Sequence, residues 1–404
     1  MKNKVLFIIL PKIWNYLPLP GVAYLIEFLE KNSIETFLLD FSIYNEYNKS
    51  QILKEISSVI SKNKITHLAF STYNTNFLIS LEIAYQLKNE YRNNIKIIFG
   101  GPAIFYFYFF NEKYLLNDYI DYYVIGEGEI PLLEILKNNI SKKIIKFIQS
   151  KNLDIYPFPT YKKFKLSNYK RKNAIPIVAS RGCINKCKFC AERLIFPYYR
   201  TRKAENIFKE IKYHYTVNNI RWFTFYDSLF NGNLKNIEKL FDLIISEDLK
   251  ISWDAQIAIR NDMNENLIKK IKKSGCINLF IGLETGSKTI LKSMNKRFTL
   301  NEAENFFKLL NDNGINFEIS LILNYPGETE KNFNESISFI LQNKKYIKKI
   351  AQINPYIYYP NTEVNIKKGL NLYRGYQKVE YLLNILKEHK IKYTNAYINN
   401  LLKL

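Results

Sequence analysis

The chain has 404 residues, 47% hydrophobic and 15% aromatic, which is enough to bury a large core and is unlike a disordered protein. The formal net charge is +22, but the lysines are scattered among many Asn, Ile, Tyr and Phe residues, which favours codon bias over a nucleic-acid-binding footprint. Four cysteines are too few for a secreted disulfide scaffold. We find no signal-peptide pattern and no apolar run long enough to span a bilayer, so we expect a cytoplasmic protein without a transmembrane segment. An anionic substrate or a membrane surface stays open as a partner.

The first 137 residues alternate short apolar strand patterns with amphipathic helix patterns such as 22–32 and 77–91. The expected strands are 4–10, 35–40, 66–72, 96–101 and 121–129. This alternation predicts an α/β domain, a doubly wound, Rossmann-like parallel sheet over residues 1–137. Ligands of such sheets bind at the carboxyl ends of strands, although the glycines there could also serve only as tight turns. No Gly-x-Gly-x-x-Gly follows the first strand, which disfavours a dinucleotide.

A second strand–helix series follows a lysine-rich segment, 138–172, that we interpret as a linker. Its expected strands are 175–181, 221–228, 251–260, 277–285, 317–326 and 351–360. Six such repeats predict a partial (β/α)6 TIM-type barrel over residues 173–364, with its chemistry at the carboxyl ends of the strands. Residues 365–404 are expected to form a C-terminal helical extension.

Three cysteines, Cys183, Cys187 and Cys190, follow the first strand of this barrel in the pattern C-x3-C-x2-C. Structural zinc sites take four ligands, usually in two separated pairs, and no such partner pair lies nearby. A four-iron cluster held by three thiolates keeps one iron open for a further ligand. Cys276 lies 86 residues after the third cysteine and precedes an apolar strand, so we expect it to be a buried small hydrophobe.

This pattern, with Phe189 before its last cysteine, resembles the radical S-adenosylmethionine (SAM) superfamily. Further segments resemble the subfamily of class B methyltransferases that carries an N-terminal cobalamin-binding domain. They are PLPGVAYLIEFLEKN (18–32), DYYVIGEGEIPLLEIL (121–136), GLETGSKTILKSMNK (282–296), NYPGETE (324–330) and YYPNTEV (358–364). Asn324 and Asn361 stand where the family usually has glycine. The resemblance extends from about residue 4 to residue 365.

The resemblance implies one [4Fe-4S] cluster on Cys183, Cys187 and Cys190, with SAM bound to the open iron. The residues implied to contact SAM lie at the ends of barrel strands two, three and four: Asp227, Ser228, Gln256, Arg260 and Glu284. Residues 324–328 would lie beside the adenine. Two structural alternatives stay open, namely that Asp227 caps the following helix and that Glu284 forms a structural ion pair.

The resemblance also implies cobalamin in the first domain. The candidates for contacting it are Ser71, Thr72, Tyr73, Gly100, Gly101 and Gly126. The family signature Asp-x-His-x-x-Gly, whose histidine ligates cobalt, is absent around His67, His214 and His389. We therefore expect either cobalamin without a protein histidine ligand or a domain that has lost the cofactor.

The implied function is methyl transfer to an unactivated carbon by a deoxyadenosyl radical and methylcobalamin. The alternatives are radical cyclisation or rearrangement without methyl transfer, and a non-catalytic redox sensor that binds the cluster and cobalamin. A small-molecule, lipid or peptide substrate fits equally well, and the resemblance implies an electron donor such as flavodoxin or ferredoxin. No catalytic residue beyond the cofactor ligands can be named from the sequence.

Overall fold

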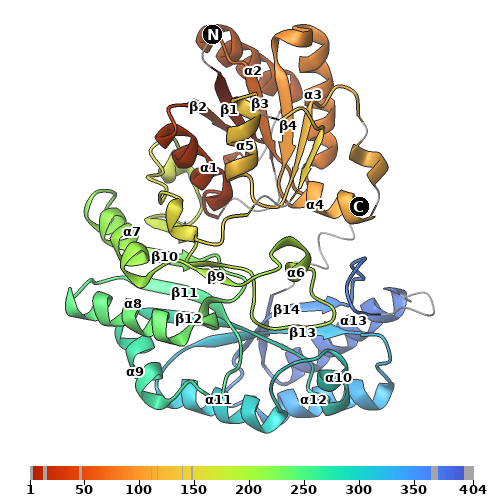
Figure 1. Cartoon of the computed structure of the whole chain (residues 1–404). Helices are drawn as coiled ribbons and strands as arrows, with labels where there is room; N and C mark the ends of the chain where they lie inside the picture. Colours follow the sequence, from red (N-terminus) through yellow and green to blue (C-terminus); the bar gives the residue numbers. More distant parts are fainter. Residues whose placement is uncertain are drawn as a thin grey trace. The chain divides into compact units, whose positions relative to one another are not determined.

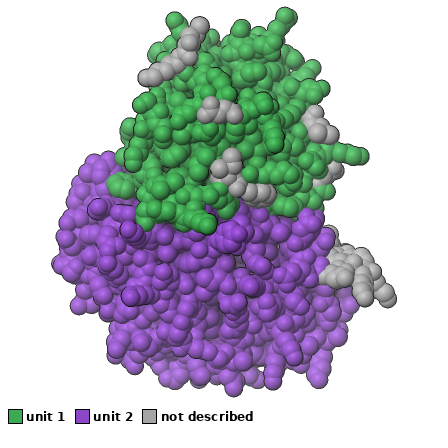
Figure 2. Space-filling view, viewed as in Figure 1, with its two compact units in different colours: residues 1–176 green, residues 177–404 purple. Residues whose placement is uncertain are grey.

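The computed structural model describes residues 3–11, 16–44, 48–110, 112–115, 117–138, 140–146, 149–364 and 372–394. The chain divides into two compact units, residues 1–176 and 177–404, which Figure 2 colours green and purple. No helix in the described ranges combines the length and the apolar character that a membrane span needs.

Unit 1 contains a six-stranded, all-parallel sheet in the order β2-β1-β3-β4-β5-β6, of which Figure 1 labels β2, β1, β3 and β4. The strands are β1 (Lys4–Ile9), β2 (Glu35–Asp40), β3 (His67–Ser71), β4 (Lys96–Gly100), β5 (Tyr122–Ile125) and β6 (Ile144–Lys146). The helices are α1 (Pro20–Lys31), α2 (Lys49–Asn63), α3 (Phe77–Tyr91), α4 (Pro102–Phe110) and α5 (Glu129–Leu136). All five strands predicted for this domain are present, and β6 is an additional edge strand from the segment interpreted as a linker.

The strand order places the topological switch point of this sheet between β1 and β3. The central strand β1 is buried along nearly its whole length, with Leu6, Ile8 and Ile9 fully inaccessible, as expected for a parallel strand covered on both faces. Helix α2 buries Ile52, Ile56 and Ile60, one residue per turn, and begins at Asn48, whose Oδ1 accepts the Ser50 N–H at 2.9 Å. The doubly wound prediction is confirmed, and such sheets bind ligands where neighbouring strands diverge at the switch point.

Unit 2 is built on a seven-stranded parallel sheet in the order β15-β14-β13-β12-β11-β10-β7. The strands are β7 (Ala174–Ile177), β10 (Trp222–Phe225), β11 (Ser252–Ile257), β12 (Cys276–Glu284), β13 (Phe317–Leu323), β14 (Lys349–Pro355) and β15 (Lys392–Tyr393); β8 (Ser180–Arg181) and β9 (Arg200–Thr201) form a separate antiparallel pair. The helices are α6 (Glu192–Ile195), α7 (Ala204–Thr216), α8 (Leu234–Ser246), α9 (Glu265–Lys273), α10 (Lys288–Ser293), α11 (Leu300–Asp312), α12 (Glu330–Gln342) and α13 (Leu372–Glu388). The six predicted barrel strands are all present, and the barrel-like fold is confirmed, with β15 adding a seventh strand beside β14.

Short 3-10 helices connect several of these elements. They are η1 (Phe41–Ile43), η2 (Arg92–Asn94), η3 (Glu112–Leu115), η4 (Leu153–Ile155), η5 (Leu166–Asn168) and η6 (Phe230–Gly232).

Alternation along β11 shows how the sheet of unit 2 presents polar residues on one face. Trp253 is buried and stacks on Phe241 of α8, with ring centroids 5.3 Å apart, so this face packs against the helices. Asp254 and Gln256 alternate with the buried positions and therefore lie on the opposite face. Thr299 and Thr329 start α11 and α12 with reciprocal capping boxes, which fix where these helices begin after β12 and β13.

The predicted domain boundaries at 137/138, 172/173 and 364/365 stay predictions. Of the predicted C-terminal extension, residues 372–394 contain α13 and β15, and the remainder lies outside the described residues.

Candidate active site at the three-cysteine loop

The three cysteines lie on a loop that follows β8, at the carboxyl end of the first strand of unit 2. Gly182 opens the loop with a φ of +84°, and a Cβ there would lie 2.5 Å from the Tyr198 carbonyl oxygen, so only glycine fits. Within the loop, the Asn185 N–H donates to Cys183 Sγ at 3.4 Å and the Cys190 N–H donates to the Cys187 carbonyl at 3.2 Å.

Residues far away in the sequence hold this loop in place. The Lys188 N–H donates to the Met294 carbonyl at 3.0 Å, and the Lys188 carbonyl accepts the Glu363 N–H at 3.0 Å. The Asn295 side-chain amide donates to the Lys186 carbonyl at 2.6 Å. The loop backbone on both sides of Cys187 is thus hydrogen-bonded to distant parts of the chain.

The three thiols are free, half-buried neighbours. Burial raises the pKa of each, that of Cys190 to about 12, and the adjacent Cys183 and Cys187 add to the shift at Cys190. Across the part of the chain that the structure describes, no three His, Cys, Asp or Glu side chains are arranged around a single metal ion. Three thiolates from one loop would suit a [4Fe-4S] cluster, in which each thiolate binds a different iron, and a bound metal deprotonates its thiols outright.

Phe189, inside the loop, anchors it to the protein interior. Its ring lies edge-on to Tyr325, with centroids 6.4 Å apart, and packs against a buried cluster that includes Ile290 and Met294. Tyr325 in turn contacts Tyr356 edge-on at 5.2 Å. The aromatic residue before the last cysteine therefore joins the loop to the ends of β13 and β14.

Asp227 is fully buried beside the start of the loop. Its carboxylate accepts the Ala179 N–H at 3.3 Å, the Ser180 hydroxyl at 2.5 Å and the Ser180 N–H. Burial raises the pKa of Asp227 to about 7 despite these hydrogen bonds. Helix α8 is capped by Asn233, whose Oδ1 accepts the Asn236 N–H, and not by Asp227.

Ser228, the next residue, donates its hydroxyl to Glu192 of α6. Glu192 is largely buried, and burial raises the pKa of its carboxyl group. This contact ties the end of β10 to the short helix that follows the cysteine loop.

Glu284 ends β12 with a φ of +71°, an unusual conformation for a residue with a long side chain. Its carboxylate accepts the Ser320 hydroxyl at 2.9 Å and pairs with Lys296 at 3.3 Å. Lys296 also donates to the Gly282 carbonyl at 2.7 Å, and both charged side chains are about nine-tenths buried. The ion pair weighed as an alternative for Glu284 is present.

The two candidates on strand three differ in environment. Gln256 is exposed on the polar face of β11. The Arg260 guanidinium is occupied by the protein itself, since it pairs with Asp262 at 2.5 Å and donates to the carbonyls of Asn231 at 2.9 Å and Gly232 at 3.0 Å. The structure therefore leaves Gln256, but not Arg260, open to a ligand.

The turn after β13, residues 324–328, is stabilised by a buried ion pair. Asn324 has a φ of +58°, a left-handed conformation that Asn tolerates better than most residues other than glycine. Its N–H donates to Glu328 at 2.8 Å, and Glu328 pairs with Lys378 of α13 at 2.7 Å. The side chains of Glu328 and Lys378 are only 1% and 5% exposed. Sequence reasoning missed Lys378, because nothing around it distinguishes it from other helix lysines.

In unit 1, the candidate residues at the carboxyl edge of the sheet bind one another closely. The Thr72 N–H and hydroxyl both donate to the Gly100 carbonyl at 2.8 Å. Gly101 has a φ of +100°, and a Cβ there would lie 2.6 Å from the Thr72 carbonyl oxygen. Gly126, with a φ of +90°, directly follows β5 at the same edge, and Ser71 ends β3 half-buried. At Gly101 the missing side chain permits this close approach of the Thr72 backbone.

Asn76 is the residue at this edge that sequence reasoning missed. It is 1% exposed, its Oδ1 accepts the Tyr73 N–H at 2.7 Å, and its amide donates to the Leu10 carbonyl at 3.2 Å. It thereby joins the ends of β1 and β3 at the switch point. Its position directly before the 77–91 helix pattern suggests only an N-cap, although its side chain makes no cap hydrogen bond.

His67 begins β3 and therefore lies at the edge of the sheet opposite the switch point. It is buried, burial lowers its pKa to about 4, and its Nδ1 contacts the Thr66 hydroxyl at 2.8 Å. It is thus a neutral core histidine far from the ligand edge.

Comparisons with known families match both units. Residues 177–340 match the family described as the radical SAM superfamily, and residues 8–136 match the B12 binding domain family.

Several curated proteins are similar over most of the chain. An uncharacterized methyltransferase of Pyrococcus horikoshii is 25% identical over 95% of this chain and 85% of that protein. The bacteriochlorophyllide d C-8(2)-methyltransferase of Chlorobaculum tepidum is 25% identical over 70% of this chain and 64% of that protein. The anaerobic magnesium-protoporphyrin IX monomethyl ester cyclase of Rubrivivax gelatinosus is 21% identical over 79% of this chain and 61% of that protein.

Two solved structures share the fold. The cobalamin-dependent SAM radical enzyme OxsB has a TM-score of 0.72 at 17% identity; the alignment covers 95% of this chain, which spans 56% of the OxsB chain. The radical SAM methyltransferase TsrM of Kitasatospora setae has a TM-score of 0.73 at 15% identity over 87% of this chain and 72% of TsrM.

Proposed function

Because the chain belongs to the radical SAM superfamily and carries a B12-binding domain ahead of its radical SAM domain, we propose that it is a cobalamin-dependent methyltransferase acting on an unactivated carbon. The observation that carries this proposal is the presence of both sites in one chain. Unit 2 has three preorganised thiols with no fourth in the loop, and unit 1 has a glycine-lined strand edge at a switch point. A [4Fe-4S] cluster with SAM supplies the radical chemistry, and cobalamin supplies the methyl group.

We assign Cys183, Cys187 and Cys190 as the cluster ligands. The hydrogen bond that the loop donates to the Met294 carbonyl, and those that it accepts from Asn295 and Glu363, hold the loop in position, so little reorganisation is needed when the cluster is inserted. Asp227 acts as a positioning residue, since it binds Ser180 at the start of the loop.

The SAM contacts we propose are Ser228, Gln256, Glu284 and the backbone of Asn324. Glu284 is oriented by Ser320 and Lys296, which leaves its carboxylate rigid enough to accept hydrogen bonds from ribose hydroxyls. Arg260 supports the 231–232 backbone rather than the SAM carboxylate, because its donors are already bound.

In unit 1 we propose that Ser71, Thr72, Tyr73, Gly100, Gly101 and Gly126 contact cobalamin, with no histidine from the protein on cobalt. His67 supports this by its position at the opposite edge and by its neutral, buried state. Asn76 would fix the Tyr73 loop around the corrin.

Cyclisation without methyl transfer is the second candidate, because one relative that covers 79% of the chain is a cyclase. The substrate is a small molecule, a lipid or a peptide. We place the enzyme in the cytoplasm, where free thiols and a cluster are kept reduced, with flavodoxin or ferredoxin as its electron donor.

The deciding experiment uses protein purified without oxygen after growth with cobalamin. We expect four irons and one corrin per chain and, on reduction with SAM, release of 5′-deoxyadenosine and S-adenosylhomocysteine. Deoxyadenosine alone would favour the cyclase-type reaction, and zinc in place of iron would refute both.

A further inference from the structure

Exposed cations lie on the cysteine loop and on the segment to which it is hydrogen-bonded. Lys186 and Lys188 flank Cys187 and are exposed. The hydrogen bonds of this segment to Met294 and Asn295 bring it beside Lys292 and Arg297, which are also exposed. We call these four residues the loop cation patch.

The patch is not neutralised by nearby acids. In the ranges that the structure describes, none of its four residues forms an ion pair. The acids around the loop have other partners: Glu363 pairs with Arg193 at 2.9 Å, Glu284 pairs with Lys296 at 3.3 Å, and the half-buried Glu192 accepts a hydrogen bond from the Ser228 hydroxyl. The four cations of the patch are therefore exposed and have no acidic partner among the described residues.

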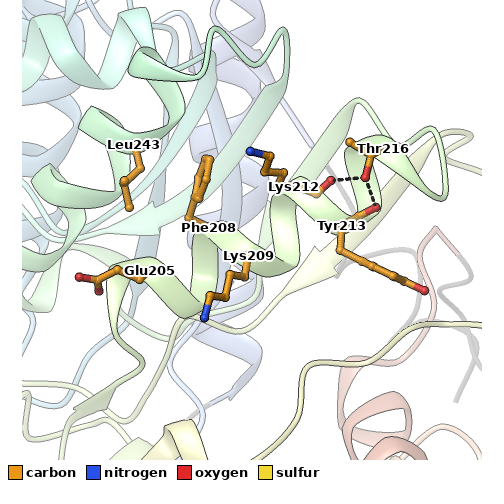
Figure 3. A pocket seen from close by; sticks show the side chains of 7 residues that line it. All are labelled: Glu205, Phe208, Lys209, Lys212, Tyr213, Thr216 and Leu243. Atoms are coloured by element: carbon orange, nitrogen blue, oxygen red, sulfur yellow. Dashed lines mark hydrogen bonds between the residues drawn. The ribbon is translucent and has the colours of Figure 1, made fainter.

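On another lysine-bearing surface of unit 2, by contrast, acidic residues pair with the lysines. A pocket of about 420 Å³ along α7 is lined by Phe208, Leu243, Lys209 and Lys212, among others (Figure 3). There Lys212 pairs with Glu247 at 2.8 Å, and Glu205 pairs with Lys239. Most of the charge is compensated within the fold, as is usual for a solvated helix surface.

We propose that the loop cation patch is the docking surface of an acidic one-electron carrier protein. This inference rests on the proposed function, since the cluster must be reduced once per radical event. A carrier bound on Lys186 and Lys188 would place its cofactor beside the Cys187 thiolate, because these lysines are the immediate neighbours of that ligand. Opposite charge steers such encounters and raises their rate, and salt screens the attraction.

The electron balance is simple for a flavin carrier. Its anionic hydroquinone gives one electron and becomes the neutral semiquinone, while the cluster takes up that electron. No bond forms or breaks, so the surface needs to supply only orientation and proximity.

The test compares two variants of the reconstituted full-length protein with equal change in net charge. K186E/K188E/K292E inverts three patch residues. K209E/K235E/K273E inverts three exposed lysines on α7, α8 and α9 that form no ion pair among the described residues. The first readout is the dissociation constant for flavodoxin at 50 mM salt, and the second is the rate of cluster reduction by flavodoxin hydroquinone compared with dithionite.

The patch variant is expected to bind flavodoxin about tenfold more weakly and to be reduced correspondingly more slowly by it, with less of a difference at 0.5 M salt. The control variant should stay within about twofold, and dithionite should reduce all proteins alike. The proposal would be overturned if both variants bound flavodoxin equally weakly, or if the patch variant bound it as tightly as wild type does.

A further arm uses single-stranded DNA. If it binds wild type more tightly than flavodoxin does and loses affinity in the patch variant, the patch serves nucleic acid and the proposal fails. The proposed function fails separately, if wild type forms no 5′-deoxyadenosine even with dithionite.

Discussion

Replacing Lys378 by Met should destabilise unit 2 strongly, although the residue lies outside every predicted site. The change leaves Glu328 buried, with a side chain 1% exposed, and without the cation that lies 2.7 Å away in wild type. Glu328 already has one buried oxygen, Oε1, with no hydrogen-bond partner among the described residues, so the turn has no spare donor to compensate. Breaking one side of a buried ion pair costs about 3–5 kcal/mol.

For a unit of this size, such a loss lowers the melting temperature by roughly 6–20 °C. The assay is urea and thermal unfolding followed by circular dichroism on cluster-free, full-length protein. Lys269→Met is the matched control, because its partner Glu265 lies at a similar distance, 2.8 Å, but both side chains are about 60% exposed. We expect it to cost at most about 1 kcal/mol.

The double variant K378M/E328Q separates the lost pair from lost packing. Because E328Q removes the unpaired carboxylate charge, it should restore a large part of the free energy of unfolding lost in K378M, so the double variant should be more stable than K378M alone. A K378M variant as stable as the Lys269→Met control, or a double variant less stable than K378M, would refute the reasoning.

Three further outcomes are expected. Serine at any one of the three loop cysteines should abolish cluster loading, whereas Cys276→Ala should retain four irons per chain, and iron analysis distinguishes them. For Asp227, the folded-state pKa of about 7 lies above its unfolded value, so wild type loses stability relative to D227N as pH rises from about 4 to 7. Urea unfolding of both proteins across this range should show that the free energy of unfolding of wild type falls by a few kcal/mol relative to that of D227N. A difference between the two proteins that does not change with pH would contradict this prediction. Gly101→Ala forces a Cβ against the Thr72 carbonyl at a φ of +100°, so we expect a cost of about 1–3 kcal/mol and weaker cobalamin uptake, measured by corrin absorbance. Uptake equal to wild type would show that this edge does not contact the corrin.

Regular patterns made the strands predictable. Buried parallel strands such as 4–9 appear as continuous apolar runs, and all the predicted strands of both sheets are present. The short edge strands β6 and β15 escaped notice, because three-residue and two-residue segments rich in lysine show no hydrophobic periodicity.

Side-chain partners were harder to predict than strands. The spacing of the cysteines suggests their chemistry directly, but Arg260 looks equally available in the sequence whether or not Asp262 and the 231–232 carbonyls occupy it. Lys378 and Glu328 are 50 residues apart, and no local rule connects them. From the sequence, Asp227 could contact SAM or cap the following helix, and only the fold places Ser180 beside its carboxylate.

The backbone contacts of the cysteine loop also set an order of events during synthesis. Lys188 is held by Met294 and by Glu363, which leave the ribosome more than a hundred and about 175 residues later. Until then the three thiols belong to an unfinished parallel sheet, whose pairings are non-local and slow to form. Cluster delivery to the nascent chain would therefore meet an unassembled loop, so the metal is expected to be inserted only after translation has passed residue 363.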